Sequence, residues 1–504
     1  MDAPRRIVIV GGGSAGWMSA AALAARLGQG AWQITLVESD EIGIVGVGEA
    51  TIPPIRGFNA RIGLDEDEFL RETGGTFKLG IEFVNWGARG ERYMHAFGDI
   101  GRPLDELPFH QHWLRLGSEV PLAEFSINNL AALAGRFMRP RPDMAGSPLA
   151  EIAYAFHFDA SRYAALLRRH SEKLGVQRIE GRIARVEREG DHIHRLHLHN
   201  GAFVEGDFFL DCSGLHALLI GQTLGVAFED WSNWLPCDRA WAVPTASHGP
   251  LLPFTRATAH DAGWQWRIPL QHRVGNGHVF ASAFTDEAAA RDTLMRNLDA
   301  EPLAAPRLIK FRTGRRQQAW VGNCVAIGLS SGFLEPLEST SLHLIQSAVL
   351  RLIDLFPSAG LEAADIAEYN RQTAAEMASV RDFIILHYKL TRRDDSPFWR
   401  HCRAMAVPES LQARMDLFAS HGRLFRQGQE LFSEPSWLQV LIGQGPRPRG
   451  HHPLADTRPR EQVQAFVADV RHVVRRCVDV MPTHADFLAD INAVNQRHPS
   501  PHET

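Results

Sequence analysis

A glycine-rich turn near the N-terminus constrains the fold more than any other feature of the chain. Residues 7–11 read IVIVG, an uninterrupted apolar run suited to a buried parallel strand. The sequence GGGSAGW overlaps its end and places Gly11, Gly13 and Gly16 in GxGxxG spacing ahead of an alanine-rich helical segment. Small residues there permit a tight turn and let a pyrophosphate approach the helix N-terminus. The pattern predicts an α/β sheet that binds an adenine dinucleotide.

Two later segments fit the same kind of sheet. The run ITLVE ends in Glu38, where an acidic side chain can accept a hydrogen bond from a ribose hydroxyl. The segment FFLDCSG at 208–214 is an apolar strand that ends in Asp211 and a small-residue turn, which is common where a chain re-enters such a sheet. Glycine-rich residues 42–55 suit a loop close to a flat cofactor, and Glu49 within it has either a functional or a structural role.

Residues 322–356 place a carboxylate at the start of a predicted helix. A strand at 324–327 and a small-residue turn lead to a loop that carries Glu338, and we expect the helix to open at Ser339 or Thr340 with a hydroxyl N-cap. The first amide hydrogens of a helix have no partner within it, so they attract a phosphate, a carboxylate or a halide. The segment is therefore either an anion site or an ordinary capping loop.

Lys78 is notable because the chain uses arginine for almost every other basic residue. Of 53 basic residues only four are lysine. An amine with a lowered pKa can transfer protons or react as a nucleophile, which a guanidinium group does not do readily. Lys78 is thus either a functional amine or a solvated surface residue.

Aromatic side chains gather in two segments, and those of the first suit the wall of a substrate pocket. His95 and Phe97 alternate, so they share one face of an extended backbone. The segment WQWRIP also alternates, and a proline ends its strand. Trp264, Trp266 and Ile268 share one face of this strand, where the tryptophan pair can simply pack in a core, and Pro269 ends the strand.

The composition limits the classes of partner. A net charge of -5 leaves no basic surplus to neutralise nucleic-acid phosphates. The five cysteines have neither CxxC nor metal-ligand spacing, so we predict reduced thiols and no metal site. No apolar run approaches the length of a membrane span, and the N-terminus lacks the apolar run of a signal peptide. We expect a cytoplasmic protein without nucleic-acid or membrane partners.

The pattern of the chain changes near residue 360. Strand-like segments and glycine-rich turns precede it, and the pattern after it is mostly helical. We therefore predict a dinucleotide-binding domain at 1–360, which includes inserted substrate-pocket segments, and a mostly helical lobe at 361–504.

Taken together, these motifs resemble the flavin-dependent halogenases of the tryptophan halogenase family. The resemblance covers nearly the whole chain and rests on GGGSAGW, GVGEATIP, Lys78, the WxWxIP match in WQWRIP, and PLEST ahead of a helix. It implies an FAD-binding Rossmann-like domain of the flavin monooxygenase type with a mostly helical C-terminal substrate lobe. The cofactor-binding residues that we expect are Gly11, Gly13, Ser14, Ala15, Gly16, Glu38, Ala50, Thr51, Val186, Asp211, Leu329 and Leu342.

The resemblance also implies a reaction. Reduced FAD, oxygen and a halide give hypohalous acid, which travels through a tunnel to Lys78 and is held there by hydrogen bonding or as a haloamine. Halide is expected near the backbone amides of Thr340 and Ser341. Glu338 would stabilise the cationic ring intermediate and accept its proton.

The substrate side departs from the family members that act on free tryptophan. His95 and Phe97 match family residues that line the substrate pocket, and WxWxIP is expected to restrain simple monooxygenation. Enzymes that act on tryptophan usually have glycine at the position of Ser341, and they grip the amino acid with a tyrosine pair where this chain has Ser436 and Trp437. Indole or another small electron-rich aromatic is therefore the expected substrate.

Partners and rival functions follow from the same comparison. The chain has no second GxGxxG for a nicotinamide, so we expect a separate flavin reductase to supply reduced FAD. A homodimer is a possible assembly, because dimers are the commonest symmetric form. The rival functions are a flavin-dependent aromatic hydroxylase, which needs neither Lys78 nor Glu338, and a flavin-binding protein without turnover.

Overall fold

The computed structural model describes residues 5–28, 30, 32–41, 48–117, 119–357, 360–445 and 447–497. The chain forms two compact units, each assembled from three segments. The first unit contains residues 1–75, 158–239 and 309–378, and the second contains 76–157, 240–308 and 379–504. The expected boundary at residue 360 falls inside the third segment of the first unit, and that division of the chain stays a prediction.

The first unit is built on a six-stranded sheet that confirms the predicted nucleotide fold. Its order is β20-β21-β12-β1-β2-β8, and β1 pairs in parallel with both β2 and β12. These central strands are apolar and buried, as a sheet covered on both faces requires. The strands are β1 (Arg5–Val10), β2 (Trp32–Glu38), β8 (Gln177–Glu180), β12 (Phe208–Asp211), β20 (Trp320–Val321) and β21 (Cys324–Ala326).

The glycine-rich turn joins β1 to α1 (Ser14–Leu27) as predicted. Gly11 has a φ of +111°, a conformation that L side chains rarely adopt. A Cβ on Gly16 would lie 1.8 Å from the carbonyl oxygen of Gly11, so only glycine lets the helix approach the strand this closely. Part of the predicted flavin-contacting loop, residues 42–47, lies outside the described residues.

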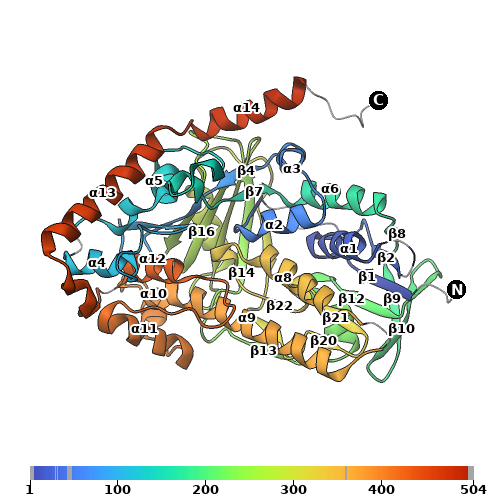
Figure 1. Ribbon diagram of the computed structural model, residues 1–504. Coiled ribbons are helices and arrows are strands. Elements are labelled where there is room, and N and C mark those ends of the chain that lie inside the picture. Colours follow the sequence, from blue (N-terminus) through green and yellow to red (C-terminus); the bar gives the residue numbers. More distant parts are fainter. Residues whose placement is uncertain are drawn as a thin grey trace. The chain divides into compact units, whose positions relative to one another are not determined.

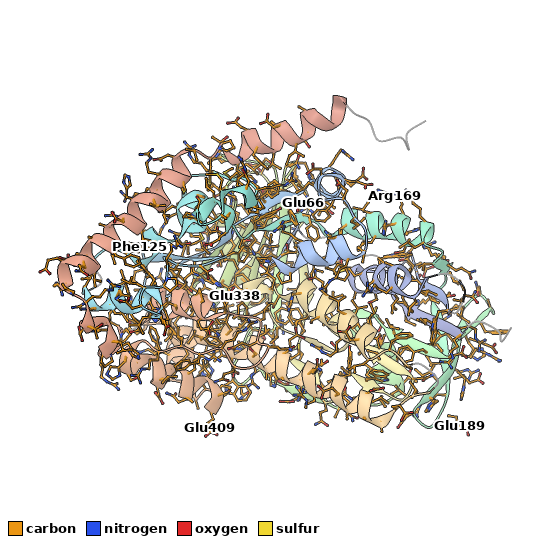
Figure 2. The ribbon with its side chains drawn as sticks, in the orientation of Figure 1. Glu66, Phe125, Arg169, Glu189, Glu338 and Glu409 are labelled. Carbon is orange, nitrogen blue, oxygen red and sulfur yellow. The ribbon has the colours of Figure 1, made fainter. Side chains whose placement is uncertain are left out.

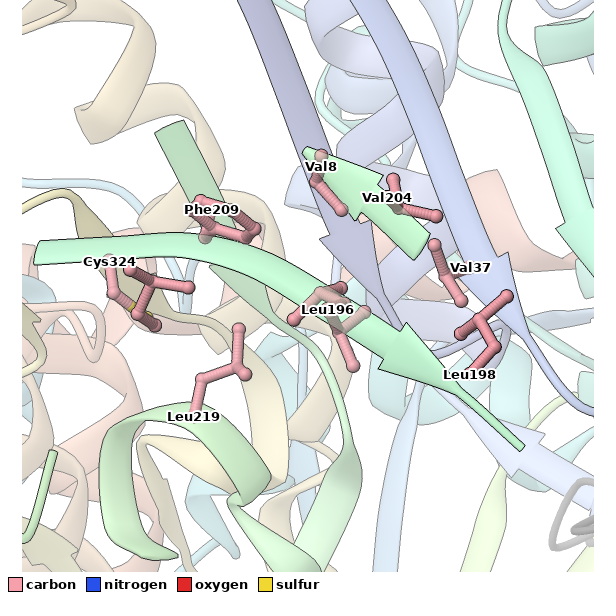
Figure 3. Packing of buried hydrophobic residues seen from close by; sticks show 10 residues of the cluster. Val8, Val37, Leu196, Leu198, Val204, Phe209, Leu219 and Cys324 are labelled. Atoms are coloured by element: carbon pink, nitrogen blue, oxygen red, sulfur yellow. The ribbon is translucent and has the colours of Figure 1, made fainter. Parts of the chain in front are cut away.

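A three-stranded meander covers part of this sheet. Its strands are β9 (Ile183–Glu189), β10 (His192–Leu198) and β11 (Phe203–Glu205), paired antiparallel in the order β11-β10-β9. Leu196 and Leu198 of β10 pack with Val8 and Val37 of the main sheet in one buried cluster (Figure 3). Burial of these apolar side chains is the main force that holds the meander to the sheet.

Helices complete the first unit. Helix α8 (Ser341–Asp354) packs against α1 (Figure 1). Helix α9 (Ala363–Lys389) is 27 residues long, and residues 363–378 of it belong to this unit. The remaining helices are α2 (Pro54–Arg61), α3 (Glu66–Thr73) and α6 (Ala160–Lys173), and the remaining strands are β3 (Gly48–Ala50), β13 (Phe228–Asp230), β19 (Gly314–Arg316) and β22 (Gly332–Phe333).

The second unit is built on a seven-stranded sheet in the order β18-β14-β17-β16-β15-β5-β6. The predicted WQWRIP strand is β16 (Gly263–Pro269), which pairs antiparallel with both β15 and β17. The other strands are β5 (Gly80–Val84), β6 (Arg92–Ala96), β14 (Arg239–Thr245), β15 (Thr255–His260), β17 (Val274–Phe280) and β18 (Arg307–Lys310). A separate short strand, β4 (Thr76–Lys78), pairs antiparallel with β7 (Ala155–Asp159).

The C-terminal part of the chain is helical, as predicted. Its helices after α9 are α10 (Pro397–Ala404), α11 (Glu409–His421), α12 (Glu434–Gln444), α13 (Arg460–Asp479) and α14 (His484–Arg497). Earlier helices of the second unit are α4 (Phe109–Arg115), α5 (Ile127–Leu133) and α7 (Glu287–Arg296). Within the described ranges, no helix is long and apolar enough to cross a membrane, and no group of three or more metal-ligating side chains occurs.

Candidate active site

Glu338 ends a short 3₁₀ helix, η7 (Pro336–Glu338), just before α8. Its side chain is 1% exposed and lies inside the unit, whereas Glu189 of the same unit projects at the rim (Figure 2). Ser339 follows with a φ of +58°, which turns the backbone sharply between Glu338 and the helix. The sequence therefore places a buried carboxylate directly before a helix N-terminus, as predicted.

Thr340 occupies the N-cap position of α8, but its hydroxyl does not cap the helix. The side chain makes no capping hydrogen bond, and its oxygen is fully buried with no hydrogen-bond partner among the described residues. The expected hydroxyl residue at the N-cap is therefore confirmed, but no capping hydrogen bond forms, because Thr340 has an αR backbone instead of the extended one that capping requires. An unsatisfied buried hydroxyl beside the unpaired first amides of a helix suits a small anion.

The glycine-rich turn offers space for a pyrophosphate at the start of α1. A Cβ added to Gly13 would meet no atom within 4 Å, although Gly13 is the N-cap residue of that helix. At the end of β2, Glu38 accepts a 2.5 Å hydrogen bond from Arg178 Nε, which fixes its carboxylate near the turn. A Cβ on Gly12 would collide with this carboxylate. The open cradle and the fixed acid fit an adenine dinucleotide such as FAD.

Asp211 fixes the turn that follows β12, a structural role that the sequence did not indicate. Its carboxylate is fully buried and accepts hydrogen bonds from the amides of Ser213, Leu219 and Ile220, and from the Ser213 hydroxyl. These bonds fix the turn that follows β12 at the carboxyl end of the sheet. Its contact with the flavin stays a prediction.

The other expected cofactor-binding residues are distributed around the same sheet. Ala50 and Thr51 are buried at the end of β3, and Leu342 is buried in the first turn of α8. Leu329, in contrast, is an exposed large apolar side chain, and Val186 packs partly buried against the meander cluster. Ser14 and Ala15 open α1 directly after the cradle.

Glu49 is a half-buried carboxyl group on β3. Loss of solvent around it raises the pKa of Glu49 to about 7. The group therefore changes its protonation state close to neutral pH, which no sequence pattern indicated.

Lys78 is the last residue of β4 in the second unit, and its side chain is 0% exposed. The alternative of a solvated surface lysine is therefore wrong. The Nζ atom lies 5.4 Å from the ring centroid of Phe97, which is a cation–π distance. Burying an amine is costly unless its surroundings stabilise it, so a buried lysine beside an aromatic ring indicates a chemical role.

His157 locks the strand that carries Lys78. The Thr76 hydroxyl donates to the Pro269 carbonyl at 2.7 Å, so His157 Nδ1, 3.0 Å away, must donate to Thr76. Burial, and next the charge of Lys78, hold the pKa of His157 well below its usual value, so the ring is neutral. Its Nε2 therefore accepts from the Thr255 hydroxyl at 2.9 Å. This network ties the end of WQWRIP to β4, and its members are too far apart in sequence to be predicted together.

The expected substrate-pocket residues form a second aromatic group. His95 and Phe97 are both buried, and the His95 ring lies 5.4 Å from that of Phe383. Trp437 is also buried: the Arg414 guanidinium carbon lies 4.0 Å from the centroid of its ring, and the Phe383 ring meets it edge to face at a centroid distance of 4.8 Å. Phe383 thus lies in contact with both His95 and Trp437, and a direct role for Trp437 in the pocket stays a prediction.

Gln439 holds the strand between His95 and Phe97. Its side-chain amide accepts from Ala96 N and donates to Ala96 O, each at 2.9 Å, on the edge of β6 that β5 leaves open. Helix α12 therefore fixes the backbone of the predicted substrate segment. A single glutamine in a largely apolar, buried helix gives no sequence signal for such a contact.

Comparisons with known proteins agree with these features. A family model described as tryptophan halogenase matches residues 6–460. The chain is 33% identical to tryptophan 7-halogenase from Lentzea aerocolonigenes, covering 96% of this chain and 98% of that protein. It is 34% identical to tryptophan 6-halogenase from Streptomyces toxytricini, covering 98% and 99%.

Two solved structures have a higher sequence identity to this chain than these two relatives. A flavin-dependent halogenase from Xanthomonas campestris has a TM-score of 0.93 and 49% identity, covering 97% of this chain and 98% of that chain. A flavin-dependent halogenase from Brevundimonas sp. BAL3 has a TM-score of 0.93 and 46% identity, covering 97% and 99%. The similarity therefore extends over nearly the full length of both proteins in each comparison.

Proposed function

The chain belongs to the tryptophan halogenase family, and from that premise we propose that it halogenates indole or another small electron-rich aromatic compound, using reduced FAD, oxygen and chloride or bromide. The observation that supports this most strongly is the complete burial of Lys78 beside Phe97. A flavin hydroxylase has no need of a buried amine at this position, so Lys78 favours halogenation over the hydroxylase alternative.

The first unit supplies the cofactor site. FAD held there in its reduced form would supply, together with oxygen, the oxidising power needed to convert halide into hypohalous acid. Gly13 leaves room for the pyrophosphate at the start of α1, whereas Gly11 and Gly16 form the tight turn that brings the helix close to the strand. Glu38, which Arg178 holds in place, would accept a hydrogen bond from the ribose. The neighbouring contacts that we expect come from Ser14, Ala15, Ala50, Thr51, Val186, Asp211, Leu329 and Leu342.

We infer that the halide is held at the start of α8. The backbone amides of Thr340 and Ser341 and the unsatisfied Thr340 hydroxyl are hydrogen-bond donors in a buried setting. Chloride and bromide accept hydrogen bonds and complement the positive end of the helix dipole.

Lys78 then holds hypohalous acid and delivers its halogen to the aromatic ring. The ring carbon forms a bond to the halogen as the O–X bond of hypohalous acid breaks, and the hydroxide that leaves takes a proton from the Lys78 ammonium group and departs as water. The network of His157, Thr76 and Pro269 keeps the backbone of β4 in place, so that the amine keeps one position. A guanidinium group cannot form a haloamine in the same way, which explains a lysine in an arginine-rich chain.

Glu338 accepts the proton that the halogenated ring carbon loses. Its negative charge also stabilises the cationic ring intermediate, and burial strengthens that interaction because little water screens it. The carboxylate thus acts as a general base and as an electrostatic stabiliser.

The proposed substrate is smaller than tryptophan. Trp437 is buried against Arg414 and Phe383 where tyrosine residues grip the amino acid in tryptophan-specific enzymes. His95 and Phe97 offer aromatic surface that suits a flat electron-rich ring. Indole and simple indole derivatives meet these conditions.

A separate flavin reductase is proposed as the source of reduced FAD, because the sequence holds a single GxGxxG motif. A homodimer is proposed as the assembly on general grounds.

The function is tested by product analysis. The purified protein is supplied with FAD, a flavin reductase, NADH, oxygen, chloride or bromide and a panel of indoles, phenols and free tryptophan. Mass spectrometry should show halogen isotope patterns for indoles and little or none for tryptophan. Hydroxylated products alone would support a hydroxylase, and no product across the panel would support a flavin-binding protein without turnover. Rapid oxidation of NADH without the reductase would contradict the separate-partner proposal.

A further inference from the structure

One face of α8 is held by a single carboxylate from α9. His343, Ser347 and Arg351 are spaced four residues apart, so they lie on the same side of three successive turns. All three contact Glu376: His343 Nε2 lies 3.2 Å from Oε1, Ser347 Oγ donates to Oε2 at 2.9 Å, and Arg351 Nη2 donates to Oε2 at 2.8 Å. The contacts of Glu376 are therefore distributed over the first three turns of α8.

The contacts are buried and charge-assisted. The side chains of His343, Arg351 and Glu376 are between 11% and 17% exposed. Burial acts to raise the pKa of Glu376, but the hydrogen bond and charge of His343 and the charge of Arg351 outweigh it and lower that pKa. Glu376 is thus ionised at neutral pH, and charge-assisted bonds to it are stronger than neutral ones.

Arg351 anchors the far end of the contact. Besides Glu376 it donates to Gln372 Oε1 at 3.2 Å and to Thr373 Oγ1 at 2.9 Å, both on α9. At the near end, His343 lies in the first turn of α8, two residues after Ser341. Contacts at both ends fix the rotation of α8 about its axis as well as its position along that axis.

The rotation of α8 sets the direction of its first amides. Because Thr340 and Ser341 lie only three and two residues before His343, a turn of the helix by a few degrees moves their N–H groups away from a bound anion. Hydrogen bonds weaken steeply as the donor angle departs from linear. A residue that fixes α8 therefore controls halide binding without touching the halide.

We propose that Glu376 is a positioning residue for the halide end of the active site, acting through His343, Ser347 and Arg351 on the amides of Thr340 and Ser341. The inference rests on the proposed halide site. The proposed role gives α9 an influence on halide affinity, although no sequence motif connects this helix with halide binding.

The test is the halide dependence of turnover in Glu376→Gln, which keeps the shape of the side chain and removes its charge. The KM for bromide and for chloride should rise about tenfold, the ratio that corresponds to ~1.4 kcal/mol. The kcat at saturating halide and the KM for the aromatic substrate should change less than about threefold, because the amine and the base are untouched.

Asp382→Asn is the matched control. Asp382 is a buried carboxylate on the same helix, but its contacts are with Arg381 and Ser410. Its replacement should leave the KM for halide unchanged, so a general weakening of α9 is separated from a specific effect on α8. If Glu376→Gln does not fold, Ser347→Ala, which removes one of the three contacts, should raise the halide KM by a smaller factor.

The outcomes distinguish the two proposals. Product from the wild-type protein together with an unchanged halide KM in folded Glu376→Gln would overturn the positioning role and leave the proposed function intact. An equal rise of the halide KM in Asp382→Asn would also overturn the positioning role of Glu376. Absence of halogenated product from the wild-type protein would overturn the proposed function itself.

Discussion

Replacing Gly13 by alanine separates cofactor binding from folding. Gly13 is the N-cap residue of α1, with φ -77° and ψ -171°, a conformation open to any residue. An added Cβ would meet no atom of the chain within 4 Å. The space that it fills is the space that we assign to the FAD pyrophosphate.

The expected effect on stability is small because two terms oppose each other. Replacing glycine by alanine at a compatible position stabilises by ~0.4–1 kcal/mol through the unfolded chain. Alanine is a poorer N-cap residue than glycine, at a cost of ~0.5–1 kcal/mol. The net change in the free energy of unfolding without FAD should therefore be within about 0.5 kcal/mol of zero.

The expected effect on FAD binding is large. A methyl group at this position pushes the pyrophosphate away from the helix amides, and each charge-assisted hydrogen bond lost costs ~1.5–3 kcal/mol. Loss of one such bond raises the Kd for FAD by about 10- to 100-fold.

Flavin fluorescence titration gives the Kd, and thermal unfolding without FAD gives the stability. Gly57→Ala is the matched control, because Gly57 lies on exposed α2 surface and an added Cβ there also meets no atom within 4 Å. It should leave the Kd unchanged, whereas Gly16→Ala, with its Cβ 1.8 Å from a backbone oxygen, should destabilise the fold itself. Unchanged FAD affinity in folded Gly13→Ala would refute the placement of the pyrophosphate.

Two further predictions concern the carboxyl groups of Glu338 and Glu49. Glu338→Gln should lower kcat for halogenation by about 10²-fold or more, because the ring proton loses its acceptor, and steady-state product formation with a wild-type rate would show that Glu338 only shapes the loop. Glu49 has a pKa of about 7 in the folded protein, above its usual value of 4.5. The folded protein therefore binds the Glu49 proton more tightly than the unfolded chain does. The contribution of Glu49 to the free energy of unfolding is greatest below about pH 4.5 and is lost as the pH rises through 7, a difference of ~3 kcal/mol. Urea unfolding of the FAD-free protein at pH 5 and pH 8 should show this loss, and Glu49→Gln should remove it; equal pH dependence in both proteins would contradict the assignment.

The sequence predicted those parts of the fold whose conformation depends on residues close together in the chain. The GxGxxG turn is confirmed because sterics admit only glycine at Gly11 and Gly16. The WQWRIP strand is confirmed because alternation and a terminal proline suit one strand and little else. The division into two discontinuous units was not predictable, since strands as distant as β5 and β15 pair within one sheet.

In the candidate site, too, contacts between residues far apart in the chain could not be predicted from the sequence. Lys78 was recognisable as an unusual residue, but its burial depends on β7 and on His157, 79 positions further along the chain, which sequence spacing does not connect. The Thr340 hydroxyl was expected to cap α8, and the backbone conformation at Thr340 prevents it. Glu376 and Gln439 act through single side chains in helices whose sequence pattern is ordinary.

The central claim is that Lys78 carries the halogen to the substrate, and Lys78→Ala tests it most directly. The assay follows halogenated indole by mass spectrometry, oxidation of reduced FAD by absorbance, and released hypohalous acid by a chemical trap. Lys173→Ala is the control, because Lys173 is exposed on α6.

In Lys78→Ala the product should disappear while reduced FAD is still oxidised and hypohalous acid escapes to the trap, and Lys173→Ala should behave like the wild-type protein. Halogenated indole formed by Lys78→Ala at a rate close to that of the wild-type protein would contradict the account.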